Sequence, residues 1–250
     1  LFIRSTREIH VTDLGEELYS DAKKLIEERE RINMKLLSRY RSSLTLGTST
    51  IPARKILPTY LSDFLAEHED YRFSIFESNS LDIIEKVAKN ELDVGFVGMA
   101  NDNIHCDFHK IYDDQLVLIT ANTPYYQDFF KEKPKIDRLL QEPLILREKG
   151  SGNLESLDRL LKERGINKQS LNIRGFVNNL DLVINLASQG VAASVLSALS
   201  VEDNVKRGDI LAYPLEDETR AFYLVWNSNI YQKSAVKAFI DFVKEHPMEF

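Results

Sequence analysis

The chain has 250 residues, enough for one large domain or two small ones, and carries a net charge of −7 with a single cysteine, Cys106. No apolar run approaches the roughly 18 residues that a membrane-spanning helix needs. Arg4, Arg7 and Glu8 stand where a signal peptide would have its apolar core. A lone cysteine suits a reducing compartment, so we expect a cytoplasmic protein without a membrane partner. The acidic balance excludes a chain that is mainly a nucleic-acid surface, and any DNA contact must be local.

The first fifteen residues read Leu-Phe-x-Arg, then a second arginine, then a short alternating stretch that leads into Thr12-x-x-Gly15. This segment resembles the wing and exit of a winged helix-turn-helix, in particular that of the LysR-type transcriptional regulators. By that resemblance, residues 1–12 are a wing remnant, and the helices that enter the major groove lie before Leu1. The chain would then be a regulator that lacks most of its base-reading domain. Arg4 and Arg7 would contact DNA phosphates or a minor groove.

Residues 13–43 are predicted to be a long helix followed by a polar linker. Asp13 and Glu16 have the spacing of a capping box, and residues 16–45 contain no glycine or proline. Residues on one face recur every four and three positions, an average of about 3.5 that is typical of a coiled-coil seam. The seam comprises Leu14, Leu18, Ala22, Leu25, Arg29, Ile32 and Leu36. This narrow stripe favours a dimerisation arm, and the alternative is an amphipathic helix packed on its own domain.

After residue 43, short apolar strands alternate with amphipathic helices. We expect strands at 44–47, 73–76 and 94–97 and helices at 51–67 and 81–90, an alternation that implies a mostly parallel sheet. The pattern then changes, because residues 107–111 alternate and the apolar run 116–119 follows Asp113 and Asp114 directly. This arrangement suggests antiparallel strands, with the acidic pair forming a turn rather than an acid/base pair.

A second unit repeats the plan, with strands at 144–146, 173–177 and 192–194 and helices at 154–164 and 180–189. A strand at 222–226 and a helix from Ser234 complete the chain. Two such α/β units with a returning C-terminal segment resemble the type 2 periplasmic-binding-protein fold, the effector domain of the LysR family. The resemblance implies that 44–250 is one effector-binding domain. Lobe I would be about 44–115 and 221–250, lobe II about 121–220, and residues 116–120 and 221–226 would be the crossover strands.

The ligand crevice of an open α/β sheet lies beyond the carboxyl ends of its strands. Thr48, Ser49 and Thr50 bring three hydroxyls to a predicted helix N-terminus, which favours an anion. On the residues alone, Ser49 or Thr50 could equally cap the helix. The resemblance favours the ligand interpretation, because the effector contact of the family falls on this junction.

Two further strand-to-helix junctions and one turn complete the expected effector site. These contribute Gly98, Met99, Gly150, Ser151, Asn178 and Asn179, with Arg147 and Lys149 as possible charges. Such groups fit a compact anion or an amino-acid-like ligand better than a large apolar one. The run Ser49-Thr50-Ile51-Pro52-Ala53, with Leu57-Pro58, looks closest to the LysR branch linked to selenium or sulfur metabolism.

The sequence carries no recognisable catalytic motif, such as His-Glu-x-x-His or Gly-x-Ser-x-Gly, so we expect neither an enzyme nor a cofactor. His105, Cys106 and His109 suggest a metal site, but on an alternating strand the histidines face one way and the cysteine the other. The expected partners are promoter DNA, a small-molecule effector and further copies of the chain in a homodimer or homotetramer. The alternative is a solute-binding protein of a transporter, which would share the fold but would need a signal peptide and no wing.

Overall fold

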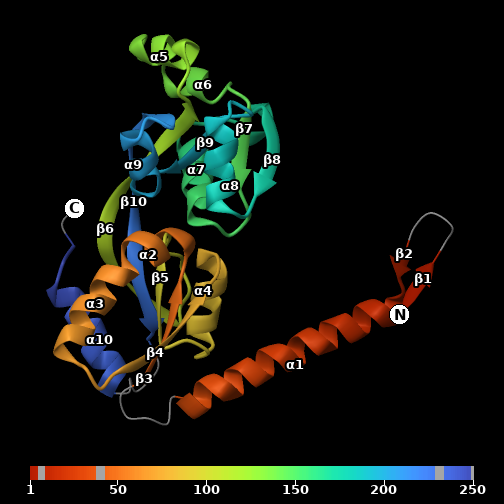
Figure 1. Ribbon diagram of the computed structural model, residues 1–250, viewed down its shortest axis with the longest axis vertical. Coiled ribbons are helices and arrows are strands. Elements are labelled where there is room, and N and C mark those ends of the chain that lie inside the picture. Colours follow the sequence, from red (N-terminus) through yellow and green to blue (C-terminus); the bar gives the residue numbers. More distant parts are fainter. Residues whose placement is uncertain (5–8, 38–42, 229–233, 249–250) are drawn as a thin grey trace. The chain divides into compact units, whose positions relative to one another are not determined.

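The computed structural model describes residues 1–4, 9–37, 43–228 and 234–248. The chain divides into two compact units, Leu1–Ser43 and Leu44–Phe250 (Figure 1). None of the described helices is both long and apolar enough to cross a membrane.

The first unit is a β-hairpin followed by one helix. Strand β1 (Phe2–Arg4) pairs antiparallel with β2 (Ile9–Val11), and helix α1 spans Asp13–Leu37. The expected capping box is wrong: the hydroxyl of Thr12 accepts the Gly15 amide at 3.1 Å, and Asp13 is the first helical residue. A side chain on Gly15 would collide with the carbonyl oxygen of Leu1, so glycine lets the hairpin lie against the start of the helix.

The predicted seam of α1 is exposed in the single chain. Leu14, Leu18, Leu25 and Ile32 are 65%, 51%, 72% and 47% exposed. Singly exposed leucines are ordinary, but a row of them on one helix face is an uncovered apolar surface.

The second unit is a two-lobed α/β domain, as expected. Its strands are β3 (Ser43–Thr48), β4 (Arg72–Glu77), β5 (Val94–Val97), β6 (Cys106–Ala121), β7 (Leu144–Arg147), β8 (Ile173–Val177), β9 (Ser194–Ser197) and β10 (Ile210–Asn227). Its helices are α2 (Thr50–Lys55), α3 (Leu57–Glu67), α4 (Ser80–Ala88), α5 (Pro124–Lys131), α6 (Ile136–Leu139), α7 (Gly152–Glu163), the 3-10 turn η1 (Lys168–Ser170), α8 (Leu180–Ser188), α9 (Ala198–Lys206) and α10 (Ser234–Glu245). Lobe I holds β3–β5, α2–α4 and α10, and lobe II holds β7–β9 and α5–α9 (Figure 1).

The strand order is β4-β3-β5-β10-β6-β9, with β7 and β8 forming a parallel pair. A parallel bridge between Leu144 and Ala193 connects that pair to the residues before β9. The core of lobe I includes the contact of α3 with α10, where the rings of Phe64 and Phe239 meet edge to face at 5.0 Å. A separate apolar cluster, rich in leucine and including Leu118 and Leu160, lies in lobe II.

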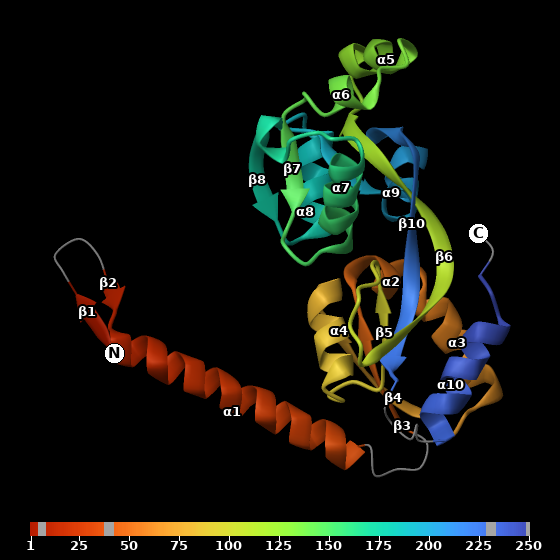
Figure 2. The same ribbon diagram turned by 180° about the vertical axis from the view of Figure 1, so that it is seen from behind.

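Strands β6 and β10 are much longer than predicted and run through both lobes (Figure 2). The prediction of a turn at Asp113 and Asp114 is wrong, because both lie within β6, opposite Ala221 and Arg220. Residues 116–119 pair with β9 and residues 223–226 pair with β5. The crossing between lobes therefore falls at 113–115 and 220–222, beside a register shift in β10, rather than at 116–120 and 221–226.

Two other boundaries differ from the prediction for local reasons. The helix expected at 51–67 is divided at Ile56 into α2 and α3, because Pro58 has no amide hydrogen and its ring excludes a continuous helix. The strand expected at 192–194 begins at Ser194, since Ala193 is used in the bridge to β7. Helices α5, α6 and α9 were not predicted.

Candidate functional site

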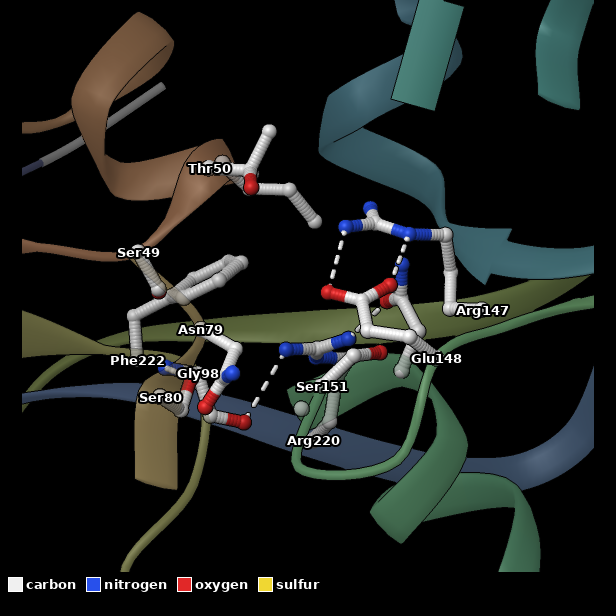
Figure 3. A pocket seen from close by; sticks show the side chains of 13 residues that line it. Ser49, Thr50, Asn79, Ser80, Gly98, Arg147, Glu148, Ser151, Arg220 and Phe222 are labelled. Atoms are coloured by element: carbon white, nitrogen blue, oxygen red, sulfur yellow. Dashed lines mark hydrogen bonds and ion pairs between the residues drawn. The ribbon is translucent and has the colours of Figure 1, made fainter. Parts of the chain in front are cut away.

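A small cavity lies between the lobes beyond the carboxyl ends of β3, β4, β5 and β7 (Figure 3). The described residues that line it are Ser49, Thr50, Ile51, Asn79, Ser80, Gly98, Arg147, Glu148, Ser151, Gly152, Asn153, Arg220 and Phe222. The position agrees with the rule for open α/β sheets. Its polar lining and small size suit a compact polar ligand.

Four residues of the predicted effector site line this cavity: Ser49, Thr50, Gly98 and Ser151. Ser49 occupies the N-cap position of α2, but among the described residues no helix amide donates a capping hydrogen bond to its hydroxyl. Its amide donates to the carbonyl of Phe96 at 2.8 Å, which fixes the backbone at the end of β3. The hydroxyl of Ser151, in contrast, accepts the Leu154 amide at 3.3 Å and caps α7.

The other predicted residues lie around the cavity rather than in its lining. Thr48 is fully buried, and its hydroxyl donates to the carbonyl of Ser49 at 3.1 Å. Gly150 contacts lobe I, because its carbonyl accepts the Leu81 amide at 3.4 Å. Asn179 caps α8, because its side chain accepts the Leu182 amide at 2.8 Å. The carbonyl of Asn178 accepts a hydrogen bond from Arg147, which lines the cavity.

Met99 faces a neighbouring cavity. This second space is lined by Gly98, Met99, Ala100, Glu155, Ser156, Arg159, Arg220, Ala221 and Tyr223. Gly98 and Arg220 line both spaces, so the two adjoin at Arg220.

Arg147 is the cation of lobe II in the cavity. It ends β7 and is only 3% exposed. Its Nε and Nη2 donate to the two carboxylate oxygens of Glu148 at 2.9 and 3.2 Å, and Nη2 also donates to the Asn178 carbonyl at 3.3 Å. A buried charge requires such partners.

Arg220 lies on β10 at the crossing between the lobes and is 3% exposed. Its guanidinium donates to the Gly98 carbonyl of lobe I at 3.0 Å and to the Asn153 side chain of lobe II. Its Nε is 3.5 Å from a carboxylate oxygen of Asp114 across the strand pair, without hydrogen-bond geometry. Burial lowers the pKa of Arg220 to about 10, against the opposing effect of Asp114, so the side chain is charged at neutral pH.

The lobes approach each other closely at Gly152. A side chain there would collide with the Gly98 carbonyl and with the Arg220 guanidinium. Glycine at this position therefore allows the start of α7 to reach the end of β5.

Sequence reasoning missed most of the charged and amide groups of the cavity, namely Asn79, Glu148, Asn153 and Arg220. A signal for Arg220 existed, since it is the one basic residue between 210 and 227 and directly precedes a buried apolar run. A charge in a strand of that kind is normally paired or functional. Asn79 is a polar residue just after β4, where helix capping is the usual role. Its side chain caps α4 by accepting the Asp82 amide at 3.0 Å.

The histidine and cysteine residues near 105–109 do not converge. His105 lies in the turn before β6 rather than on the strand, and Cys106 is buried with its Sγ 3.8 Å from the Ile84 carbonyl. Burial raises the pKa of the Cys106 thiol. Within the part of the chain that the structure describes, no three His, Cys, Asp or Glu residues are grouped to hold a metal ion.

Arg4 lies in β1, and Arg7 lies outside the described residues.

Comparison with known proteins identifies similar regulators. The chain is 27% identical over 249 residues to an uncharacterized HTH-type transcriptional regulator of Methanocaldococcus jannaschii, covering 97% of this chain and 83% of that protein. It is 22% identical to the HTH-type transcriptional activator CmpR of Synechocystis, covering 98% of this chain and 81% of the activator.

The fold is similar to solved regulator structures. The effector binding domain of QuiR in complex with shikimate has a TM-score of 0.71 at 20% identity, covering 83% of this chain and 99% of that domain. Full-length CbnR complexed with its target DNA has a TM-score of 0.72 at 18% identity, covering 95% of this chain and 83% of CbnR. The model of the LysR substrate binding domain matches residues 38–247. Because this match spans most of the sequence, the chain belongs to the LysR family, and its two-lobed unit is the effector-binding domain of a transcriptional regulator.

Proposed function

We propose that the cavity between the lobes of this LysR-type regulator binds a compact anionic effector. The observation that carries the proposal is that two buried guanidinium groups, Arg147 and Arg220, line one cavity together with the hydroxyl of Ser49. Guanidinium groups form short, charge-assisted hydrogen bonds with carboxylates, phosphates and sulfate. Arginine side chains are rarely buried unless they have a structural or functional role, because removing a charged group from water costs much free energy.

Two domains of similar fold were solved with a small ligand, which supports a small molecule as the effector. The QuiR domain was solved with shikimate, and the regulatory domain of CcmR from Synechocystis, with a TM-score of 0.70 at 21% identity, was solved with 2-PG. We further propose an oxyanion or metabolite of sulfur or selenium metabolism as the effector, from the resemblance of residues 49–58 to that branch of the family. Sulfate and selenate therefore belong in the first panel of compounds.

The test is the melting temperature of residues 1–250 across a panel of small anions and sulfur metabolites. Losing one hydrogen bond to a charged ligand costs about 1.5–3 kcal/mol, so Ser49→Ala should weaken the effective compound roughly ten- to one-hundred-fold with little change in the melting temperature without ligand. If Ser49 acts only as a cap, the variant loses about 1 kcal/mol of stability and keeps its ligand response.

Arg147→Met should abolish the response, and Arg164→Met, a change of the same type at an exposed position near the end of α7, should not. A panel without any stabilising compound, or an unchanged response in Arg147→Met, would contradict the proposed site.

We also propose that the β1–β2 hairpin is a wing that contacts DNA through Arg4 and Arg7, and that α1 joins two copies of the chain through its apolar seam. The neutralisation of phosphates by arginine makes binding sensitive to salt. Arg4→Ala or Arg7→Ala should therefore weaken binding to all sequences and flatten its salt dependence, as measured by fluorescence anisotropy. A regulator of this kind acts in the cytoplasm and has no catalytic role.

A further inference from the structure

Glu148 is the only acidic side chain among the described residues that line the cavity. It follows β7 directly and is 25% exposed, whereas the Arg147 side chain is 3% exposed. Its two oxygens accept bonds from Nε and Nη2 of Arg147, in the two-point arrangement that Figure 3 shows. A carboxylate or phosphate ligand would take the same arrangement on a guanidinium. One protein carboxylate thus fills the position that an anionic ligand would need.

We propose that Glu148 is a built-in competitor of the effector, whose carboxylate holds Arg147 until an incoming carboxylate, phosphate or sulfate group displaces it. The proposal rests on the proposed function of the cavity and adds the chemical class of the group that exchanges. The pairing with Glu148 also compensates the buried charge of Arg147, since an unpartnered buried charge destabilises a fold.

Displacement of Glu148 would have a structural consequence. The carbonyl of Glu148 accepts the Ser151 amide at 3.2 Å, and Gly150, in the same turn, bonds to the Leu81 amide of lobe I. The competitor therefore belongs to the turn that touches the other lobe. Exchange of Glu148 for a ligand changes the charge and contacts of this turn, and a ligand shifts a two-state equilibrium through such differential contacts.

The test uses residues 1–250 and inorganic phosphate as the probe. In Glu148→Gln, phosphate no longer competes with a negative charge, so its affinity should rise about ten- to one-hundred-fold. The melting temperature should therefore increase with phosphate concentration more steeply than in the wild type. Glu163→Gln, which removes the same charge at an exposed position at the end of α7, should behave as the wild type.

Two further variants make the result decisive. Arg147→Met in combination with Glu148→Gln should remove the added phosphate response, which places it at this arginine. Glu148→Asp keeps the charge on a shorter side chain and should give an intermediate slope. Equal slopes in the wild type, Glu148→Gln and Glu163→Gln would overturn the competitor role, and a slope that survives in the double variant would overturn it too. In the first case the cavity can still bind its effector, because the proposed function is judged by the Arg147→Met response to the panel.

Discussion

Two adjacent acidic residues in β6 show how burial determines the contribution of an ion pair to stability. Asp113 is 62% exposed and bonds to Lys110 at 2.8 Å, a pair that solvent screens. Asp114 is 2% exposed and faces Arg220 at 3.5 Å, and its other oxygen accepts the Leu199 amide at 3.2 Å. Asp114 is therefore the counter-charge of the arginine that joins the two lobes.

Replacing Asp114 by Asn should lower the free energy of unfolding by about 3–5 kcal/mol, because Arg220 would keep its buried charge without compensation. The amide oxygen of Asn can still accept the Leu199 amide, so the change isolates the charge. Urea denaturation followed by circular dichroism measures the loss. Asp113→Asn is the matched control and should leave the stability almost unchanged. Asp114→Asn combined with Arg220→Met should cost less than the sum of the single changes, and strict additivity would contradict the pairing.

The positions of individual site residues could be predicted only where the local pattern determines them. Ser49, Thr50 and Gly98 directly follow apolar strands, and strand ends share one edge of a parallel sheet. Arg220 could not be placed in this way, because its burial depends on pairing with Asp114 in a strand that is distant in the sequence. Glu148 and Asn153 were missed because helix and strand periodicity does not reveal which polar side chains face inward just after a strand or in the first turn of a helix.

At the level of elements, the strength of the apolar pattern determined how closely the bounds of a strand or helix could be predicted. The strand at 173–177 and the helix from Ser234 were located closely, since the strand alternates half-buried and exposed positions and the helix has a regular buried face. The lengths of β6 and β10 could not be predicted, because two neighbouring acids are typical of a turn and only pairing between the strands shows that they continue. The N-cap of α1 is Thr12 rather than the predicted Asp13, a difference of one residue. Both side chains are of types that cap helices.

The seam of α1 leads to a prediction about assembly. Leu25→Glu with Ile32→Glu should separate dimers that form through the helix, because each change places a charge in an apolar contact between copies. Sedimentation velocity at tens of micromolar measures the change, and circular dichroism checks that the effector-binding domain stays folded. Ser20→Glu with Lys23→Gln lowers the net charge equally on the outer face and should leave the assembly intact. A wild type that is monomeric at this concentration would contradict the seam.

Across the whole two-lobed unit, ion pairs from α2 join lobe I to lobe II. Arg54 donates to both carboxylate oxygens of Asp181 at 2.6 and 2.7 Å, and Lys55 lies 2.5 Å from Asp203. These bonds hold the pKa of Asp181 and of Asp203 below the usual range. A carboxyl group with a lowered pKa stabilises the paired state at every pH above its ordinary pKa. This stabilisation is lost only as the pH falls through the lowered value. The contact between the lobes should therefore not change with pH near neutrality.

The amide of Leu81 reports directly on this contact. It lies in the first turn of α4, where helix amides have no partner within the helix, and its acceptor is the Gly150 carbonyl of lobe II. Asp181→Asn removes one exposed ion pair between the lobes, so the lobes should separate more often and the Leu81 amide should exchange with solvent roughly two- to five-fold faster. Hydrogen exchange measured by NMR at neutral pH provides the rate. The Ile83 amide, which bonds to the Asn79 carbonyl within lobe I, should keep its rate. Asp128→Asn removes an exposed pair within α5 and should change neither amide. Faster exchange at both amides would indicate loosening of lobe I itself, and unchanged exchange at Leu81 would show that the Arg54–Asp181 pair does not hold the lobes together.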